Sequence, residues 1–472
     1  VENLPRIVAV PLRLAAYSLI LATFVVAGCA PGHDGVPAPA ASLGAAADSA
    51  ADVSARPDDA PRTDPGIPAA FAGADTVRID TIALGVRHLY AWDPRGPWGI
   101  HLLEIDAARC GPVYEARKAG PPQSARARTG ALAADALAGI NADFFRLPGG
   151  TTVSAHVEGG RIVAGPGARP VVALGDGRWW IGRAALQGLV ARRGGDVIAP
   201  IVQVNRTHPG DTAGVVLFTE WYGEATPVED AGGGEGAGPA AAGTSPAGTA
   251  ASAPAGGAVR VTAVTVRQLD PAADAARTSG RTVAEGAGAV GVVAAVDSMG
   301  GSQPLSPGTV VLHGRGSTAA ALRRLAVGDT VVWSTSVISA DGARRAAREA
   351  VGGYPVLLRD GEFAPEMEEG VNPSFGERRH PRTAVGFADD GRRMFWLVVD
   401  GRQDPYSDGM SLREVATLLR DLGAEEALNL DGGGSSALVV RGRVANRPSD
   451  PTGERPVGNA LVLAGCRAEG AG

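Results

Sequence analysis

Cysteine is scarce in this sequence. The chain has three cysteines and no Cys-X-X-Cys pair, so we do not expect a zinc site built on thiolates. Two of the three, Cys110 and Cys466, lie in the part of the chain that we expect to fold. In an oxidising compartment they could form one disulfide, or they could remain two thiols, and their spacing does not decide between these states.

Basic charge is not in excess either. Lys and Arg number 44 against 50 Asp and Glu, which gives a net charge of -6. Nucleic-acid binders usually carry a basic excess, so the composition argues against that class of partner. Glycine (67 residues) and proline (34) are abundant but follow no Gly-X-Y period, which excludes collagen. Long apolar runs after residue 75 exclude wholesale disorder.

The N-terminal segment, residues 1–29, resembles a bacterial lipoprotein signal. Arg6 and Arg13 provide its positive charge, and the apolar run 14–28 is too short to span a bilayer comfortably. The run ends in Val-Ala-Gly followed by Cys29, which resembles a lipidation site. An ordinary signal peptide that contains a cysteine is the alternative. We predict an exported protein of the bacterial cell envelope, anchored to a membrane by lipid on Cys29.

Composition divides the rest of the chain. Residues 30–74 are rich in Ala, Pro, Gly and Asp without apolar periodicity, so we expect a disordered tether. A low-complexity insertion of similar composition covers residues 231–257. The folded domain is expected over 75–466, with a β-rich lobe at 259–338 and the main motif-bearing region at 351–463.

Hydrophobic periodicity predicts short strands with a few helices between them. We therefore predict an α+β fold, in which a mixed β-sheet core with packed helices forms a single catalytic unit and carries the inserted β-rich lobe. Outside the C-terminal third, the predicted elements are strands over 76–82 and 98–105, a hairpin over 153–163, and helices over 129–138 and 317–325.

A strand, a helix and a second strand follow one another in the C-terminal third. This order predicts a crossover between parallel strands, which end at the same edge of a sheet. Asp400 ends the first strand and Asp431 the second, so we expect their carboxylates roughly 5–10 Å apart on that edge. Antiparallel strands would remove this argument. The predicted elements are strands over 383–387, 394–399, 428–430 and 437–440, a turn at 389–391, and a helix over 411–422 that begins with the capping box of Ser411 and Glu414.

The segment NLDGGGSS (429–436) is a candidate site. Its glycines, Gly433 among them, permit unusual backbone angles and close approach, and successive exposed N–H groups can bind an anion. Asp431 beside them offers acid, base or nucleophile chemistry, and Ser436 closes the segment. A glycine-rich hairpin turn is the alternative. No Gly-Lys-Ser/Thr follows, so the segment is not a P-loop.

Three arginines in turns or at a strand start would suit an anionic substrate. Arg382 follows His380 and a proline that restricts how the chain enters its strand, while Arg402 and Arg455 lie beside Gly or Pro. Guanidinium groups bind phosphate or carboxylate in a bidentate manner. Each arginine taken alone is more typical of an ordinary surface or turn residue, and only the three together indicate an anion site.

The run NADFF (141–145) is a further candidate. If it is extended, Asn141 and Asp143 lie on one strand face and could reach a common ligand. An Asx turn is the alternative, and we expect the two phenylalanines to lie in the core.

The motifs together resemble the phosphodiester glycosidase family. The resemblance rests on GGYPVL (352–357), HPRTAVGF (380–387), VVDGR (398–402), NLDGGGSSALV (429–439) and GERPV (453–457), in this order. NADFF is similar to the Asn-Gly-Asp-Phe-Phe of the family, with Ala142 in place of Gly, which could narrow the approach beside Asp143. The wider match runs from about residue 75 to 465.

The resemblance implies hydrolysis of a sugar-1-phosphodiester, which releases the sugar and leaves a phosphomonoester. It implies a phosphorylated glycan or sugar phosphodiester as substrate. We expect the reaction to need no cofactor. By resemblance, the acidic site residues are Asp143, Asp400 and Asp431, the phosphate or sugar contacts are Arg382, Arg402 and Arg455, and Asn141, His380, Gly433 and Ser436 lie nearby.

Two other functions remain open at this point. One is a carbohydrate-binding or exopolysaccharide-assembly lipoprotein without turnover, and the other is a metal-dependent phosphodiesterase that cuts the P–O bond. No residues at metal-ligand spacing stand out, but three clustered aspartates could hold a structural Ca²⁺ or Mg²⁺.

Overall fold

The computed structural model describes residues 66–210, 212–228, 261–269, 288–341 and 345–467. The predicted signal segment with Cys29, most of the predicted tether and the insertion at 231–257 lie outside these residues. The last part of the predicted tether is described, and it packs on the domain: Ala69–Phe71 forms the short 3-10 helix η1, with Phe71 buried. Among the helices described, none has the length and apolar character needed to cross a bilayer.

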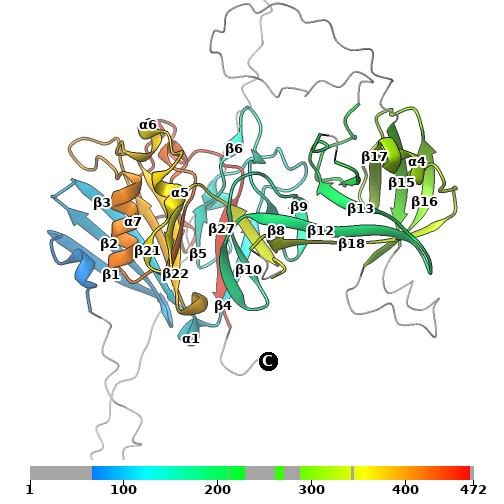
Figure 1. The fold of residues 1–472 in the computed structure, drawn as a ribbon. Helices are drawn as coiled ribbons and strands as arrows, with labels where there is room; N and C mark the ends of the chain where they lie inside the picture. The colour runs from blue at the N-terminus through cyan, green and yellow to red at the C-terminus, as the bar shows by residue number, and fades with distance from the viewer. Residues whose placement is uncertain (1–65, 211, 229–260, 270–287, 342–344, 468–472) are drawn as a thin grey trace, which may run out of the picture. The chain divides into compact units, whose positions relative to one another are not determined.

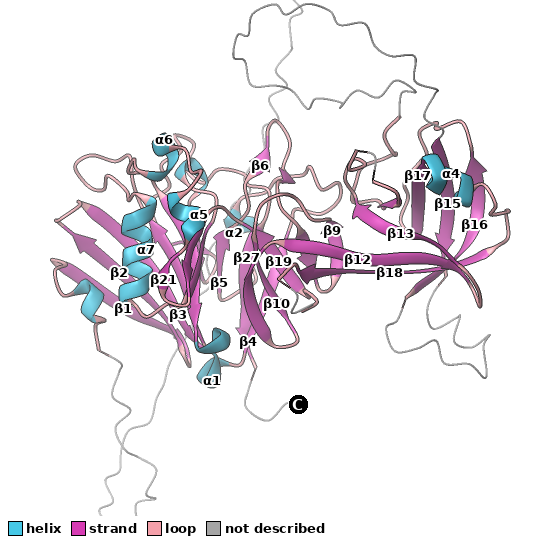
Figure 2. Cartoon of the chain, in the orientation of Figure 1, coloured by secondary structure: helices cyan, strands magenta, loops and turns pink. Residues whose placement is uncertain are grey.

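The described chain is mostly β, with several sheets and few helices, so the predicted β-sheet core is present but helices are fewer than an α+β class implies (Figure 2). The predicted helix over 129–138 is wrong beyond its first turn, because α2 ends at Leu132 and Ala138–Asn141 pairs as strand β5 with two neighbours. Tertiary pairing thus overrides local helical spacing. The helices are α1 (Ala107–Cys110), α2 (Thr129–Leu132), α4 (Gly316–Leu322), α5 (Pro365–Glu368), α6 (Pro373–Gly376) and α7 (Leu412–Asp421), with 3-10 turns η2 (Asp389–Gly391) and η3 (Gly433–Ser435).

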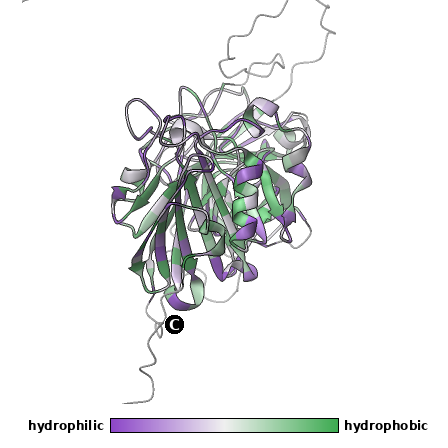
Figure 3. Cartoon of the chain, turned by 90° about the vertical axis from the view of Figure 1, so that its left-hand side faces the viewer, coloured by the Kyte–Doolittle hydropathy of each residue, from purple (hydrophilic) through white to green (hydrophobic). Residues whose placement is uncertain are grey.

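An eight-stranded antiparallel sheet carries most of the predicted motifs, in the order β1-β2-β3-β23-β22-β24-β20-β21. Its central strands are buried on both faces, and Figure 3 shows strands largely in the green of hydrophobic residues. Burial of this kind supplies the main free energy of folding. The strands are β1 (Thr76–Ala83), β2 (Val86–Asp93), β3 (Trp98–Asp106), β20 (Val356–Arg359), β21 (Glu362–Phe363), β22 (Arg382–Ala388), β23 (Arg393–Val399) and β24 (Glu426–Asn429).

The relation of β23 to β24 confirms the predicted crossover. Each pairs antiparallel with β22, which lies between them, so β23 and β24 run parallel to one another as next-but-one neighbours. Helix α7 connects them and packs on β20, β22 and β24 (Figure 1). The capping box of Ser411 and Glu414 is present. Asp400, Asp431 and the start of β22 at Arg382 therefore meet at one edge of the sheet.

The chain also forms two further antiparallel sheets. One has the order β26-β25-β5-β27-β4 and the other β11-β10-β19-β8-β9, while β6 and β7 form a two-stranded ribbon. The bounds of the first are β4 (Pro112–Arg117), β5 (Ala138–Asn141), β25 (Leu438–Val440), β26 (Arg443–Val444) and β27 (Ala460–Cys466). Those of the second are β8 (His156–Glu158), β9 (Arg161–Ala164), β10 (Val171–Gly175), β11 (Arg178–Gly182) and β19 (Glu349–Gly352), and those of the ribbon are β6 (Phe145–Arg146) and β7 (Thr151–Thr152).

The predicted β-rich lobe at 259–338 supplies part of a closed seven-stranded barrel. Strands from before the insertion complete the barrel, so its boundary in the chain lies earlier than predicted. Among the described strands, β13 and β14 form a parallel pair within it. The barrel strands are β12 (Ala184–Arg192), β13 (Val197–Val204), β14 (Val215–Phe218), β15 (Val261–Gln268), β16 (Ala289–Asp297), β17 (Thr309–Arg315) and β18 (Thr330–Ser339).

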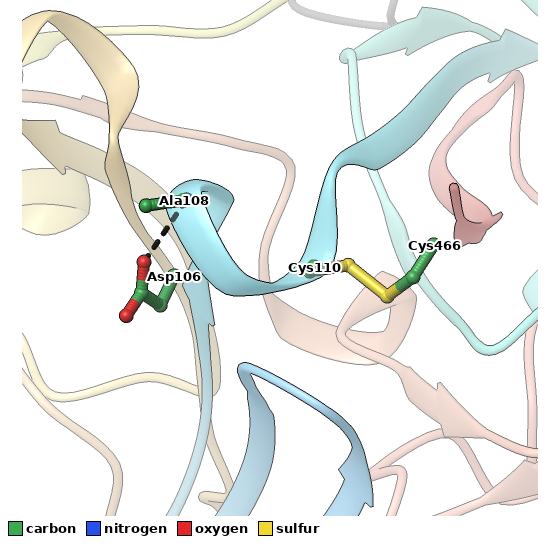
Figure 4. The surroundings of a disulfide bond; sticks show 4 residues. All are labelled: Asp106, Ala108, Cys110 and Cys466. Atoms are coloured by element: carbon green, nitrogen blue, oxygen red, sulfur yellow. Dashed lines mark hydrogen bonds between the residues drawn. A yellow bond between two sulfur atoms is a disulfide. The ribbon is translucent and has the colours of Figure 1, made fainter. Parts of the chain in front are cut away.

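A disulfide between Cys110 and Cys466 settles the choice left open by the sequence (Figure 4). Cys110 ends α1, a single turn that Asp106 caps by accepting a hydrogen bond from the Ala108 amide. Cys466 ends β27. The bond joins positions 356 residues apart, so it closes nearly the whole folded region into one loop.

We expect the Cys110→Ser, Cys466→Ser double variant to lose about 2–4 kcal/mol of unfolding free energy, because the open chain gains conformational entropy when it unfolds. Urea unfolding of both proteins measures the difference. Reducing the wild type should lower its stability to that of the variant, while a reductant should not affect the variant. Equal stability of the oxidised wild type and the variant would contradict the expectation.

Candidate active site

Three chain segments meet at the edge where β24 ends. The Asp431 amide donates a hydrogen bond to the Ala142 carbonyl (2.8 Å), and the Gly433 amide donates to the Pro381 carbonyl (2.8 Å). Asp431 follows β24 of the eight-stranded sheet, while Ala142 follows β5 of a different sheet. Asp143 and Asp431, far apart in sequence, are therefore on adjoining segments.

Asp143 is 1% exposed, and its carboxylate is held by Ser154. The Ser154 amide donates to Oδ2 (2.7 Å) and the Ser154 hydroxyl to Oδ1 (3.3 Å). Burial raises the pKa of Asp143 to about 7, although the Ser154 bonds and the charges of Arg206 and Arg169 act against this rise. A carboxyl group with this pKa exchanges its proton near neutral pH.

A series of hydrogen bonds through Asn459 and His156 positions the Asp143 backbone. Its amide donates to Asn459 Oδ1 (2.8 Å), and Asn459 Nδ2 contacts His156 Nδ1 (2.9 Å). Since an amide nitrogen can only donate, Nδ1 is the acceptor, and His156 Nε2 carries the proton that faces Glu158 Oε1 (3.0 Å). Gly352 lies against the same carboxyl group, where a Cβ would be 2.6 Å from Asp143 Cγ, so this position requires glycine.

Asp431 is half-buried at the start of the glycine-rich segment. Burial raises its pKa to about 6, and the Ser435 side chain and the charges of Arg455 and Arg169 counter part of this rise. Gly433 has a φ of +63°, and a Cβ on Gly434 would lie 2.3 Å from Arg455 Nη2. The glycines thus allow both the turn and the approach of a guanidinium to the segment.

Ser436 and Asn141 take different parts in this region. The Ser436 hydroxyl is buried and has no hydrogen-bond partner among the described residues. The Asn141 side chain instead holds neighbouring segments together. Its Nδ2 donates to the Asp431 carbonyl (2.6 Å), and its Oδ1 accepts from the Thr383 hydroxyl (2.8 Å) and the Ala437 amide (3.0 Å).

Asp400 reaches the predicted edge, but both of its oxygens already accept hydrogen bonds. Tyr406 donates to Oδ2 (2.9 Å), and Asn446 Nδ2 and the Arg447 amide donate to Oδ1 (3.0 and 2.9 Å). Asn446 in turn contacts the Ser436 carbonyl (3.2 Å). The Asp400 carboxylate thus helps to position the segment that contains Asn446 and Arg447, and its catalytic role stays a prediction.

The predicted arginines are brought near one another but differ in their hydrogen-bond partners. Arg382 is 1% exposed, with Nε donating to the Met410 carbonyl (2.8 Å) and Nη2 to the Phe375 carbonyl (2.6 Å). Arg402 is exposed and contacts His380 Nδ1 through Nη2 (3.3 Å). A Cβ on Gly433 would lie 3.3 Å from Arg402 Nη1, which places this guanidinium over the glycine-rich segment.

Arg455 and His380 complete the predicted set. Arg455 pairs with Asp450 through Nε (2.8 Å), yet its Nη2 lies over Gly434. His380 is half-buried, and burial together with the nearby charges of Arg382 and Arg402 lowers its pKa. His380 therefore stays neutral at pH 7 and contributes no positive charge to the site.

Four site residues were missed by sequence reasoning: Ser154, Arg169, Arg206 and Asn459. They come from loops and strand ends scattered through the chain, and none lies in a motif with recognisable spacing. Phe144, expected in the core, is half-buried and contacts the Arg169 guanidinium, 4.7 Å from its ring centre. Within the described ranges, no group of three His, Cys, Asp or Glu side chains could hold a metal ion.

Part of this chain matches a known protein family. Residues 282–464 match the family described as phosphodiester glycosidase. The N-acetylglucosamine-1-phosphodiester alpha-N-acetylglucosaminidase of Mus musculus is 37% identical over 84 residues, or 18% of this chain and 16% of that protein. The chain therefore matches about one sixth of the length of that curated relative.

Two solved structures are similar over most of the chain. A hypothetical protein from Synechocystis has a TM-score of 0.58 and 21% identity, over 84% of this chain and 65% of that one, which shows a shared fold. A protein from Burkholderia pseudomallei K96243, named as a candidate exported protein, has a TM-score of 0.54 and 26% identity, over 78% of this chain and 74% of that one.

The stability of Asp143→Asn relative to the wild type should be a few kcal/mol higher at pH 8 than at pH 4. The raised pKa means that the folded state holds the proton of the Asp143 carboxyl more tightly than the unfolded state does. Wild-type stability is thus lost as pH rises from about 4 toward 7, and asparagine removes this loss. Urea unfolding across this range measures the difference. Asp176→Asn, in an exposed turn, is the control and should show no such trend. A pH-independent difference for Asp143→Asn would contradict the argument.

Proposed function

Because residues 282–464 match the phosphodiester glycosidase family, we propose that this chain hydrolyses a sugar-1-phosphodiester at its glycosidic bond. The products are the sugar and a phosphomonoester. The observation that supports this proposal is the pair of carboxyl groups on adjoining segments, Asp143 and Asp431, with pKa values of about 7 and 6. Perturbed carboxyl groups in one site are typical of general acid–base chemistry.

The two pKa values suggest separate roles. Asp431 is mostly ionised at pH 7 and serves as the nucleophile or base at the anomeric carbon, where positive charge develops in the transition state. Asp143 is about half protonated at the same pH and assists as a proton donor or by hydrogen bonding. The C1–O bond breaks with its electron pair on the phosphate oxygen, and water supplies the hydroxyl group at C1.

The leaving group is an anion, so charge stabilisation matters more than a strong acid. Arg402 and Arg455 place guanidinium groups against Gly433 and Gly434, beside Asp431. Preorganised cations of this kind lower the energy of a departing phosphate ester. Asn141 and Asp400 act indirectly: the Asn141 side chain donates to the Asp431 carbonyl, and the Asp400 carboxylate accepts from Asn446 and the Arg447 amide.

The disulfide supports a location outside the cytoplasm, since disulfides persist in oxidising compartments. The similar Burkholderia protein is itself named as a candidate exported protein. We propose that the chain is exported and lipid-anchored through Cys29 in the bacterial cell envelope. Its substrates there would be envelope or extracellular glycans that carry sugar phosphodiesters.

Hydrolysis of a synthetic sugar-1-phosphodiester in ¹⁸O-labelled water tests the reaction. We expect the label on C1 of the released sugar, with none in the phosphomonoester. Asp431→Asn should lower kcat by about 10²–10⁴-fold, because it removes a carboxylate that acts on the reacting carbon. Asp176→Asn is the matched control and should retain full activity.

Other outcomes would replace the proposal. Label in the phosphomonoester would identify a phosphodiesterase that cuts the P–O bond. Sugar phosphate binding without turnover, unchanged by Asp431→Asn, would identify a carbohydrate-binding protein.

A further inference from the structure

Arg169 lies between the two carboxylate-bearing segments and belongs to none of the motifs found in the sequence. It sits between β9 and β10, and its guanidinium carbon is 4.7 Å from the Phe144 ring centre and 5.1 Å from that of Tyr354. Phe144 directly follows Asp143. The Tyr354 amide donates to the Asn429 carbonyl (2.7 Å), two residues before Asp431. Contacts with a residue of each segment therefore hold the guanidinium in the candidate site.

One nitrogen of this guanidinium lacks a partner. Arg169 Nη1 is buried and forms no hydrogen bond with the described residues. An unpaired N–H of a charged group in a buried position costs free energy, which an acceptor oxygen from a ligand would recover. The neighbouring arginines differ, since Arg382 donates to backbone carbonyls and Arg455 pairs with Asp450.

Within the described residues, Arg169 also forms no ion pair with either aspartate. It acts on both, lowering the pKa of Asp143 and of Asp431 against the larger effect of burial. Yet among the described ion pairs none joins Arg169 to a carboxylate, and the Asp143 oxygens accept from Ser154 instead. A cation that is close to both acids but bonded to neither is suited to a third anion.

We propose that Arg169 is a substrate-binding residue that donates a hydrogen bond to a non-bridging phosphate oxygen of the leaving group. It thereby makes the site selective for phosphodiesters over glycosides with neutral leaving groups. This inference rests on the proposed function and names its specificity determinant. Phe144 and Tyr354 set the orientation of the guanidinium, as stacked aromatic rings do for arginine.

The test compares two substrates of one sugar, a sugar-1-phosphodiester and a neutral aryl glycoside. Arg169→Ala should lower kcat/KM for the phosphodiester by about 10²-fold and leave the aryl glycoside nearly unchanged, because only the first presents an anionic oxygen. Arg169→Lys should recover part of the loss, since it keeps the charge without the planar fork.

Arg161→Ala is the matched control. Arg161 also lies over an aromatic ring, 5.7 Å from the centre of Trp221, but it is exposed and outside the candidate site. This variant should hydrolyse both substrates as the wild type does. An equal loss on both substrates in Arg169→Ala would overturn the proposal and indicate a structural role, as would no loss on either.

A binding measurement separates this proposal from the proposed reaction. If the wild type turns over neither substrate, the reaction is wrong, and calorimetry with a hexose 1-phosphate still tests Arg169. Binding that weakens at least tenfold in Arg169→Ala, but not in Arg161→Ala, would support the phosphate contact. Binding of equal strength in all three proteins, or no binding by the wild type, would overturn it.

Discussion

The backbone hydrogen bond from the Asp431 amide to the Ala142 carbonyl joins two sheets, and the candidate site depends on that junction. Neither sheet contains the site alone, because β24 brings Asp431 and β5 brings Asp143. The Asn141 side chain reinforces the junction by binding the Asp431 carbonyl and the Ala437 amide, which belong to the same segment. These short contacts tie the positions of the two acids to the cores of both sheets.

This junction places two carboxyl groups where ionisation is costly. Burial raises both pKa values, and the protein offsets only part of the cost with hydrogen bonds from Ser154 and nearby guanidinium charges. Such an arrangement weakens the fold at neutral pH while it keeps one acid ionised and the other close to half protonated. Sites that carry out proton transfer commonly show this conflict between stability and chemistry.

Several polar residues at this edge hold other groups in place, while two others have a buried polar atom without a partner. Asp400, Arg382 and Asn141 have the residue types expected of a catalytic site, but their atoms hold backbone groups and loops in place. Ser436 and Arg169 are buried with an unsatisfied hydroxyl or N–H among the described residues. Arg169 also contacts both acid-bearing segments through Phe144 and Tyr354, so its position as well as its unpaired N–H indicates ligand contact.

Local and near-local features could be determined from the sequence by itself. The capping box of Ser411 and Glu414, the hairpin around 158–160 and the common edge of Asp400 and Asp431 depend on residues close in the chain or on the order of consecutive elements. Only the tertiary structure decided that 138–141 is a strand, that Cys110 pairs with Cys466, and that Ser154, Arg169, Arg206 and Asn459 surround the acids. Burial and the choice of hydrogen-bond partners depend on segments that meet across hundreds of residues, and no local pattern records which segments those are.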